Sequence, residues 1–175
     1  MEKSMEFLNA SGIDHVLAEM THKILKAHKG ADHLALIGIH TCGVYVAQRI
    51  ALKIYEIEGV NIETGSIDIT MYRDDWTMIS NHPVVQATNI PFSVDGKTLI
   101  LVDDVLFTGR TVRAAMDAVI DFGRPDRIEL AVLIDRGFRE LPIQADYVGK
   151  FIKTRRNETI DVLMLEKDGI DSVVS

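Results

Sequence analysis

The chain has 175 residues, of which 47% are hydrophobic and 26% charged, and both values are ordinary for a globular protein. This length is enough for one domain with its own core, so we expect a single domain over residues 1–175. The net charge of −7 disfavours nonspecific nucleic-acid binding by the whole surface, but not binding by a local basic patch. The single Cys excludes an intrachain disulfide, and neither a membrane-length apolar run nor a signal-peptide pattern is present, so we expect a cytoplasmic protein.

The first predicted element is a helix over residues 11–29, with Ser11 as its N-cap and Gly30 at its end. Its apolar stripe consists of Ile13, Val16, Leu17, Met20 and Ile24. The opposite face carries His15, Glu19, His22 and Lys26. A polar face of this kind is usually just solvated.

A buried strand, a tight turn and a second helix follow. Residues 34–39 are apolar without alternation, which predicts a strand buried on both faces. The turn consists of His40, Thr41, Cys42 and Gly43. The helix that follows ends near Gly59. Because the first N–H groups of a helix have no partner within it, this turn is either an anion site or an ordinary strand-to-helix connection.

Residues 65–72 alternate between apolar and polar side chains, which predicts a strand with one solvated face. Its buried side would be formed by Ile67, Ile69 and Met71. A long stretch with little periodicity then reaches Gly96, which is typical of a lid or a hairpin arm. Within it, Arg73 is either a cation that closes over an anion or a partner in a surface ion pair.

The most informative stretch is residues 99–111. Four apolar residues predict a buried strand that ends at two adjacent carboxylates, Asp103 and Asp104. The turn behind them contains Thr108, Gly109, Arg110 and Thr111. A helix follows, with a predicted buried face of Val112, Ala115, Met116, Val119 and Ile120.

The residue types in this stretch suit a sugar phosphate. A loop of Thr and Gly ahead of a helix lets backbone N–H groups close around a phosphate, where the helix dipole also favours negative charge. The acidic pair cannot bind phosphate, but it can bind sugar hydroxyls, or magnesium through water. The alternative is a simple helix cap.

Later strands place further polar residues at the same edge of the predicted sheet. Residues 128–134 form an apolar strand that ends at Asp135, Arg136 and Gly137, and short strands are expected at 147–149 and 162–165. Strands that alternate with helices indicate a parallel sheet, whose ligands bind at the carboxyl ends of its strands. The turns at 40–43, 103–111 and 135–137 are therefore expected to converge.

Residues 99–111 as a whole resemble the phosphoribosyl pyrophosphate (PRPP) signature of the type I phosphoribosyltransferases. The segments 67–75, 131–137, 139–143 and 145–150 resemble the PyrR family, and the resemblance extends over about residues 5–165. It implies an α/β fold with a central, mostly parallel sheet flanked by helices, a small hood and a flexible lid loop.

The same resemblance implies two activities. One is the conversion of uracil and PRPP to UMP and pyrophosphate with Mg²⁺. The other is UMP-dependent binding of a pyrimidine-operon mRNA hairpin, which attenuates transcription. It also suggests a homodimer or homotetramer.

The resemblance also implies roles for particular residues. Ribose hydroxyls, and magnesium through water, would be held by Asp103 and Asp104, with no direct protein ligand to the metal. The phosphate would lie on Val105, Thr108, Gly109, Arg110 and Thr111. Pyrophosphate would bind His40, Thr41, Cys42 and Gly43, with Arg73 closing over it and Arg136 near the base or pyrophosphate. The base would meet backbone groups around Lys150 and Ile152, and RNA would contact His22, Arg139 and Lys150.

Departures from the family pattern keep two alternatives open. The pyrophosphate turn usually carries Lys and Arg where this chain has His40 and Cys42, which permits a UMP-sensing regulator without useful catalysis. On the RNA face, Glu19 and Gln144 replace polar or basic residues, which permits a salvage enzyme without RNA binding. Residues 136–156 nevertheless contain six basic and two acidic residues, a plausible local RNA patch.

Overall fold

The computed structural model describes residues 5–72, 74 and 87–175. Its strands are β1 (Glu6–Asn9), β2 (Leu34–Ile39), β3 (Glu63–Ile67), β4 (Thr98–Leu106), β5 (Arg127–Asp135), β6 (Tyr147–Phe151), β7 (Asp161–Leu163) and β8 (Ser172–Val174). Its helices are α1 (Ala10–His28), α2 (Cys42–Glu58), α3 (Arg110–Ile120) and α4 (Leu165–Asp168), and a 3₁₀ turn, η1, spans Thr70–Tyr72.

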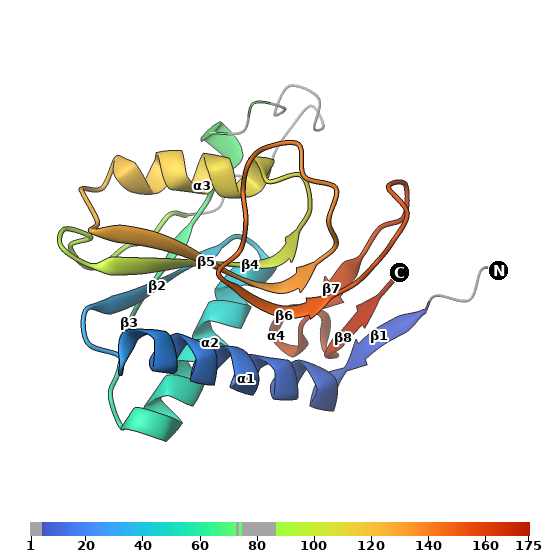
Figure 1. The fold of residues 1–175 in the computed structure, drawn as a ribbon, viewed down its shortest axis with the longest axis horizontal. Coiled ribbons are helices and arrows are strands. Elements are labelled where there is room, and N and C mark those ends of the chain that lie inside the picture. The colour runs from blue at the N-terminus through green and yellow to red at the C-terminus, as the bar shows by residue number, and fades with distance from the viewer. Residues whose placement is uncertain (1–4, 73, 75–86) are drawn as a thin grey trace.

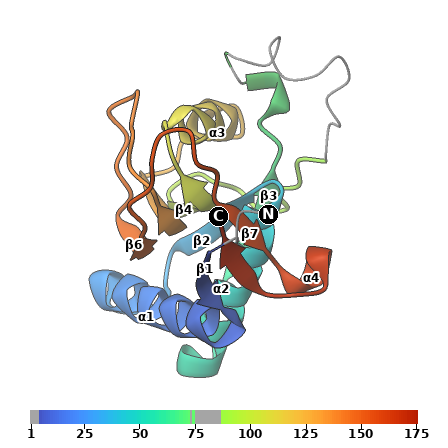
Figure 2. The same ribbon diagram turned by 90° about the vertical axis from the view of Figure 1, so that its right-hand side faces the viewer.

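Five parallel strands form the central sheet in the order β3-β2-β4-β5-β6 (Figure 1). Helices α1 and α2 lie on one face of this sheet and α3 lies on the other, so each face is covered by its own apolar cluster (Figure 2). Strand β2 is buried at every residue because both of its faces pack against helices. The predicted α/β architecture is therefore confirmed.

A smaller antiparallel sheet, β1-β8-β7, lies beside the central sheet. We call this sheet, α4 and the turn between α4 and β8 the hood. The sequence pattern predicted a strand at 162–165, but β7 ends at Leu163 and Leu165 begins α4. Strands β1 and β8 were not predicted from the pattern because segments of three or four residues show no clear period.

The order of the strands places a ligand site at the edge where β2 and β4 end. After β2 the chain adds β3 on one side, then crosses back to add β4 on the other side. The strand order therefore reverses between β2 and β4, the point at which open α/β sheets bind ligands.

Helix α1 begins earlier than its apolar pattern suggested. Asn9, not Ser11, is the N-cap, and its side chain accepts a hydrogen bond from the Gly12 N–H at 2.9 Å. At the other end, Lys29 adopts a left-handed conformation, and the Gly30 N–H donates to the Leu25 carbonyl. Two residues suited to capping stand close together here, and the sequence does not say which one the chain uses.

Strand β3 ends sooner than predicted. The Asp68 carboxylate accepts hydrogen bonds from the N–H and the hydroxyl of Thr70, at 2.8 and 2.6 Å, and this local turn ends the strand pattern. Ile67 and Ile69 are buried as expected, but Met71 is 75% exposed because it lies in η1. The prediction of a strand over 65–72 was therefore wrong beyond Ile67.

The signature strand and helix also differ from prediction in detail. Strand β4 continues through the acidic pair to Leu106, whereas the sequence suggested that it ended there. On α3 the buried residues are Val112, Ala114, Ala115, Ala118 and Val119. Ile120, the last residue of the helix, is 58% exposed, contrary to the prediction that it is buried. Among the described residues, no helix is both long and apolar enough to span a bilayer.

Candidate active site

Three turns meet at the carboxyl edge of the sheet, as predicted. They follow β2, β4 and β5, which pair side by side and in parallel. The turn after β5 is tied to β4 through the Arg136 N–H, which donates to the Leu106 carbonyl at 3.1 Å. The polar residues that are distant in the sequence thus surround one edge.

Gly43 lets the start of α2 touch the backbone of β4 directly. A Cβ atom at this position would lie 2.4 Å from the Val102 carbonyl oxygen and 3.0 Å from the Cα of Asp103. Gly38 on β2 has a similar role, because its Cβ would lie 2.4 Å from the Cα of Val44. These glycines bring the first turn of α2 against the acidic pair, a role that sequence reasoning did not assign.

The two carboxylates are held by the backbone of their own strand. Asp103 is only 5% exposed and accepts a hydrogen bond from the Asp104 N–H at 3.0 Å. Asp104 is half-buried and accepts from the Val105 N–H at 2.9 Å. These bonds fix the direction of both side chains, so each presents a defined acceptor to a ligand.

The loop between β4 and α3 has the shape of an anion cradle. Gly109 adopts a left-handed φ of 92° at the N-cap position of α3, where it has no side chain that could cap the helix. The loop is supported from behind, because the N–H groups of Glu140 and Leu141 donate to the Thr108 carbonyl at 2.9 and 3.2 Å. The first N–H groups of α3 therefore lie where a phosphate is favoured.

The side chain of Arg110 is engaged with protein carboxylates. Its Nε donates to Glu140 at 3.0 Å, its Nη1 pairs with Asp74, and both carboxylates raise the pKa of the guanidinium. Its predicted phosphate contact would then come from its backbone N–H, which in this structure reaches the Thr108 hydroxyl at 3.4 Å.

The turn before α2 also lacks a side-chain cap. Thr41 stands at the N-cap position, and no side chain of the described residues caps the helix from there. The peptide bond between His40 and Thr41 is cis. The Nε2 atom of the His40 ring lies 3.2 Å from the Ala87 carbonyl oxygen, so this ring contacts the chain at residue 87.

Cys42 is buried at the start of α2, with its thiol 3.6 Å from the Val162 carbonyl in the hood. Burial, followed by the negative charge of Asp104, raises the pKa of this thiol to about 11. The neutral thiol is a poor nucleophile. Covalent catalysis by Cys42 is therefore disfavoured.

We expect Cys42 in the folded protein to react very slowly with iodoacetamide at pH 8. A thiol with a pKa of about 11 is ionised in roughly one molecule in a thousand at that pH, and burial adds a steric barrier. Alkylation followed by mass spectrometry, with and without denaturant, measures the difference. Equal rates in the two states would contradict the burial and the raised pKa.

A pocket of about 330 Å³ lies at the end of β5 and β6 and is lined by Asp135, Arg136, Gly137, Arg139, Phe151, Ile152 and Lys153. Arg136 is only 7% exposed, stacks 4.2 Å above the Phe107 ring, and donates to the Arg155 carbonyl. Among the described residues its Nε has no partner, although it is buried. Ile152 is fixed by its N–H, which donates to the Asp135 carbonyl at 2.9 Å.

The residues predicted to contact RNA use their polar groups internally in this structure. Arg139 donates to the carbonyls of Phe107 and Ile143 at 2.9 and 3.1 Å and pairs with Asp135. It therefore braces the phosphate loop, a role that the sequence did not reveal.

Lys150 and His22 also bond within the chain. Lys150 donates to the Phe7 carbonyl at 2.9 Å and does not line the pocket, and His22 Nδ1 reaches the Ala18 carbonyl at 2.7 Å. Their RNA and base contacts remain predictions. Arg73 lies outside the described residues.

Comparison with known proteins agrees with this geometry. Residues 5–165 match the phosphoribosyl transferase domain family. The Bifunctional protein PyrR of Desulfosudis oleivorans is 58% identical over 175 residues, covering 99% of this chain and 97% of that protein. The Bifunctional protein PyrR of Clostridioides difficile is 53% identical over 173 residues, with 99% and 98% covered.

A solved structure of a hypoxanthine phosphoribosyltransferase mutant from Trypanosoma cruzi, in a ternary substrates complex, is similar with a TM-score of 0.72. The match covers 93% of this chain and 87% of the Trypanosoma cruzi chain at 20% identity, so this likeness shows the fold alone. Fold, family match and high identity agree: the chain belongs to the phosphoribosyltransferases and, among them, to the PyrR family.

Proposed function

We propose that this chain transfers a phosphoribosyl group from PRPP to uracil, giving UMP and pyrophosphate, and regulates pyrimidine genes by UMP-dependent mRNA binding. We place it in the cytoplasm as a homodimer or homotetramer. Membership of a family whose named members are bifunctional supports both activities. The observation that carries the enzymatic part is the meeting of an acidic pair and two helix starts at one sheet edge, where neither N-cap residue caps its helix with a side chain.

Each part of PRPP has a chemically suitable partner. The 5′-phosphate would lie on the N–H groups at the start of α3, with the hydroxyls of Thr108 and Thr111 as further donors. The ribose hydroxyls would donate to Asp103 and Asp104, whose carboxylates are already oriented by the backbone. The pyrophosphate would lie at the start of α2, across β4 from the phosphate loop.

Magnesium fits the same acidic pair. Carboxylate oxygens are ligands of the kind Mg²⁺ prefers, and Mg²⁺ keeps several of its waters when bound. Asp103 and Asp104 would therefore hold the PRPP-bound ion through water. When bound with PRPP, the ion neutralises the charge that develops on the departing pyrophosphate.

The protein's own contribution to the reaction is orientation and electrostatic stabilisation. As the C1–O bond of PRPP breaks, positive charge develops on the ribose and negative charge on the pyrophosphate. The start of α2 stabilises the leaving group through its N–H groups. Arg136, which lines the pocket beside Ile152, supplies a positive charge near the base or the pyrophosphate. Uracil would lie in the pocket beside Ile152, in line for attack at C1.

Two cations that the family usually places in the pyrophosphate turn are replaced by His40 and Cys42. A lost hydrogen bond to a charged group costs roughly 1.5–3 kcal/mol, a tenfold or greater loss of rate. We therefore expect slow turnover unless Arg73 and Arg136 compensate. A UMP-sensing regulator without useful catalysis is the alternative that this substitution favours.

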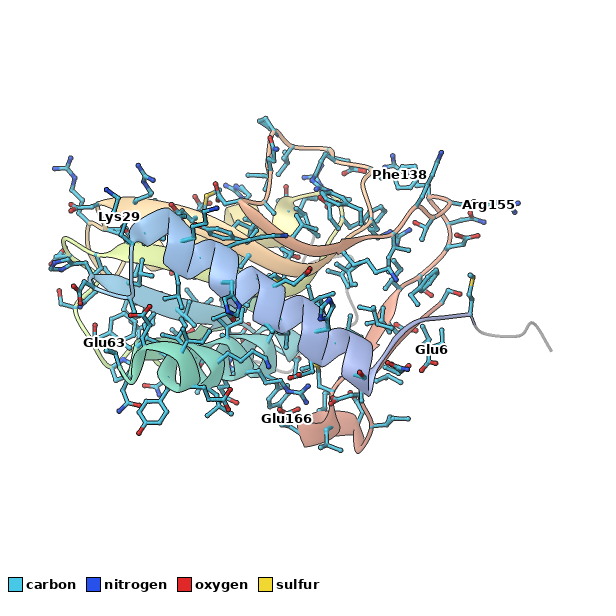
Figure 3. The ribbon with its side chains drawn as sticks, turned by 60° about the horizontal axis from the view of Figure 1, so that its bottom comes forward. Glu6, Lys29, Glu63, Phe138, Arg155 and Glu166 are labelled. Carbon is cyan, nitrogen blue, oxygen red and sulfur yellow. The ribbon has the colours of Figure 1, made fainter. Side chains whose placement is uncertain are left out.

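The RNA part of the proposal is supported by charge. Residues 136–156 carry six basic and two acidic residues inside a chain of net charge −7. Within this segment the side chains of Arg155 and Arg156 are 86% and 61% exposed. Figure 3 shows Phe138 and Arg155 at the same end of the molecule, where cations and an aromatic ring are accessible. Such a surface suits phosphates and unstacked bases.

Pyrophosphate release from PRPP and magnesium, measured with uracil, hypoxanthine, guanine, xanthine and orotate, tests the enzymatic proposal. We expect turnover with uracil alone. No turnover with any base, while UMP still raises the melting temperature, would indicate a nucleotide sensor.

The regulatory part is tested by measuring binding of a pyrimidine-operon mRNA hairpin with and without UMP, over a range of salt concentrations. We expect UMP to strengthen binding, and salt to weaken it. Absence of binding at low salt would leave a salvage enzyme.

A further inference from the structure

One face of α2 connects the candidate active site to the hood. Cys42, Arg49 and Lys53 are spaced by seven and four residues, so they lie on the same face of the helix. Cys42 contacts the hood through the Val162 carbonyl, and Arg49 contacts it through Glu166 and Asp171. Lys53, one turn further along, pairs instead with Asp14 of α1.

Arg49 makes a double clamp on the hood. Its Nε and Nη2 donate to the two oxygens of Glu166 at 2.8 and 2.7 Å. Its Nη1 and Nη2 donate to the two oxygens of Asp171 at 3.0 and 2.8 Å. Four of the five N–H groups of the guanidinium are thus used, in the paired geometry that gives arginine its strongest contacts.

The clamp is partly shielded from solvent. The Arg49 side chain is only 20% exposed and that of Asp171 only 14%. The guanidinium lowers the pKa of both carboxyl groups, and the carboxylates raise the pKa of Arg49. Asp171 also accepts a hydrogen bond from the Leu165 N–H at 2.8 Å, which fixes the start of α4. Figure 3 shows Glu166 on α4 beside α2.

The clamp joins the two sides of the proposed reaction. Helix α2 begins at the turn where pyrophosphate would leave, and the hood continues from the chain segment that follows Ile152 in the proposed base pocket. Displacement at C1 requires base and leaving group to stand on opposite sides of one carbon, at a fixed separation. The contact between α2 and the hood is therefore in a position to set that separation.

We propose that Arg49 is a positioning residue for the nucleobase, which it places relative to the pyrophosphate turn by holding the hood on α2. This inference rests on the proposed phosphoribosyl transfer. It concerns a residue outside the substrate sites proposed above. It assigns the effect to the base and not to the ribose phosphate, whose proposed partners lie on β4, on the loop after it and at the start of α3.

The kinetic test compares Arg49→Met with Lys53→Met. Both remove a cation from the same face of α2, but only the first releases the hood. For R49M we expect the KM for uracil to rise roughly tenfold, since a base held less firmly binds less well, while the KM for PRPP changes less than about twofold. For K53M we expect neither KM to change by more than about twofold. A partly unfolded sample lowers the maximal rate without moving either KM.

Hydrogen exchange tests the clamp without relying on catalysis. Amides of residues 152–174 should exchange at least about fivefold faster in R49M than in K53M. Unchanged exchange, or faster exchange with an unchanged KM for uracil, overturns the inference. If R49M does not fold, Glu166→Gln provides the same comparison, because it weakens the clamp at the more exposed partner, which is 36% exposed.

Failure of the proposed function gives a different result. A wild-type chain that makes no UMP with uracil overturns the proposed catalysis. The affinities for UMP and for ribose 5-phosphate then decide the role of Arg49. R49M should weaken UMP binding roughly tenfold and leave the affinity for ribose 5-phosphate unchanged. Equal weakening of both affinities would overturn the inference about Arg49.

Discussion

Replacing Asp103 and Asp104 together by Asn is expected to weaken PRPP and UMP binding roughly 100-fold or more. Each carboxylate would accept a charge-assisted hydrogen bond from a ribose hydroxyl, and the loss of one such bond costs about 1.5–3 kcal/mol. The two losses together correspond to a factor of at least about 100 in affinity.

The fold should tolerate this change. Asn retains a side-chain oxygen at each position, so the hydrogen bonds from the N–H groups of Asp104 and Val105 can be kept. The double variant therefore tests charge at the site more than it tests packing. A melting temperature close to that of the wild type would confirm that reading.

Calorimetric titration with UMP and with PRPP plus magnesium measures the effect. Asp117→Asn is a matched control, because this carboxylate lies on α3, is 46% exposed and pairs only with Arg113 among the described residues. Its loss should leave both affinities within about twofold. Retained affinity in the double variant would refute the assignment of the ribose site.

The sheet and its edge could be predicted from the sequence because their signals are local. Residues 34–39 and 99–102 are continuous apolar runs, and each is buried in the structure on both faces. The polar turns behind them follow from the chain order, because parallel strands end at one edge. The convergence of the three turns could therefore be predicted without knowledge of side-chain packing.

The hood could not be predicted in this way. Strand β1 pairs with β8, which lies more than 160 residues away, through a register such as Leu8 with Val173. Strands this short are stabilised by their partners and by the core beneath them, not by their own sequence. The clamp of Arg49 on Asp171 is equally non-local, since nothing near Arg49 in the sequence indicates its partner.

The roles of individual arginines were also hidden. Arg110 and Arg139 are two cations beside a phosphate loop, and the sequence suggests an anion for each. In the structure Arg110 pairs with Glu140, and Arg139 donates to backbone carbonyls around the loop. A carbonyl partner leaves no trace in the sequence, because every residue has one. Such bracing is therefore visible only in three dimensions.

Gly43→Ala is expected to damage both stability and catalysis. The added Cβ would lie 2.4 Å from the Val102 carbonyl oxygen, and that oxygen belongs to the backbone of a central strand and cannot move aside. Helix α2 must shift instead, at a cost of roughly 1–3 kcal/mol for overpacking. The shift also moves the pyrophosphate turn away from Asp103, and a displacement of about 1 Å at a reacting centre can cost roughly 100-fold in rate.

Gly12→Ala is the matched control for this change. It lies in the first turn of α1, where the added Cβ would meet side-chain atoms and no strand backbone: the Leu8 Cδ2 methyl at 3.0 Å, Asn9 Oδ1 at 3.4 Å and Leu8 Cβ at 3.6 Å. Helix propensity alone predicts a gain of up to about 1 kcal/mol there. Denaturant unfolding should therefore move in opposite directions in the two variants, whereas kcat/KM for PRPP should fall only in Gly43→Ala. If Gly43→Ala keeps wild-type kcat/KM, the close contact between α2 and β4 does not position the leaving group, and the pyrophosphate site must lie elsewhere.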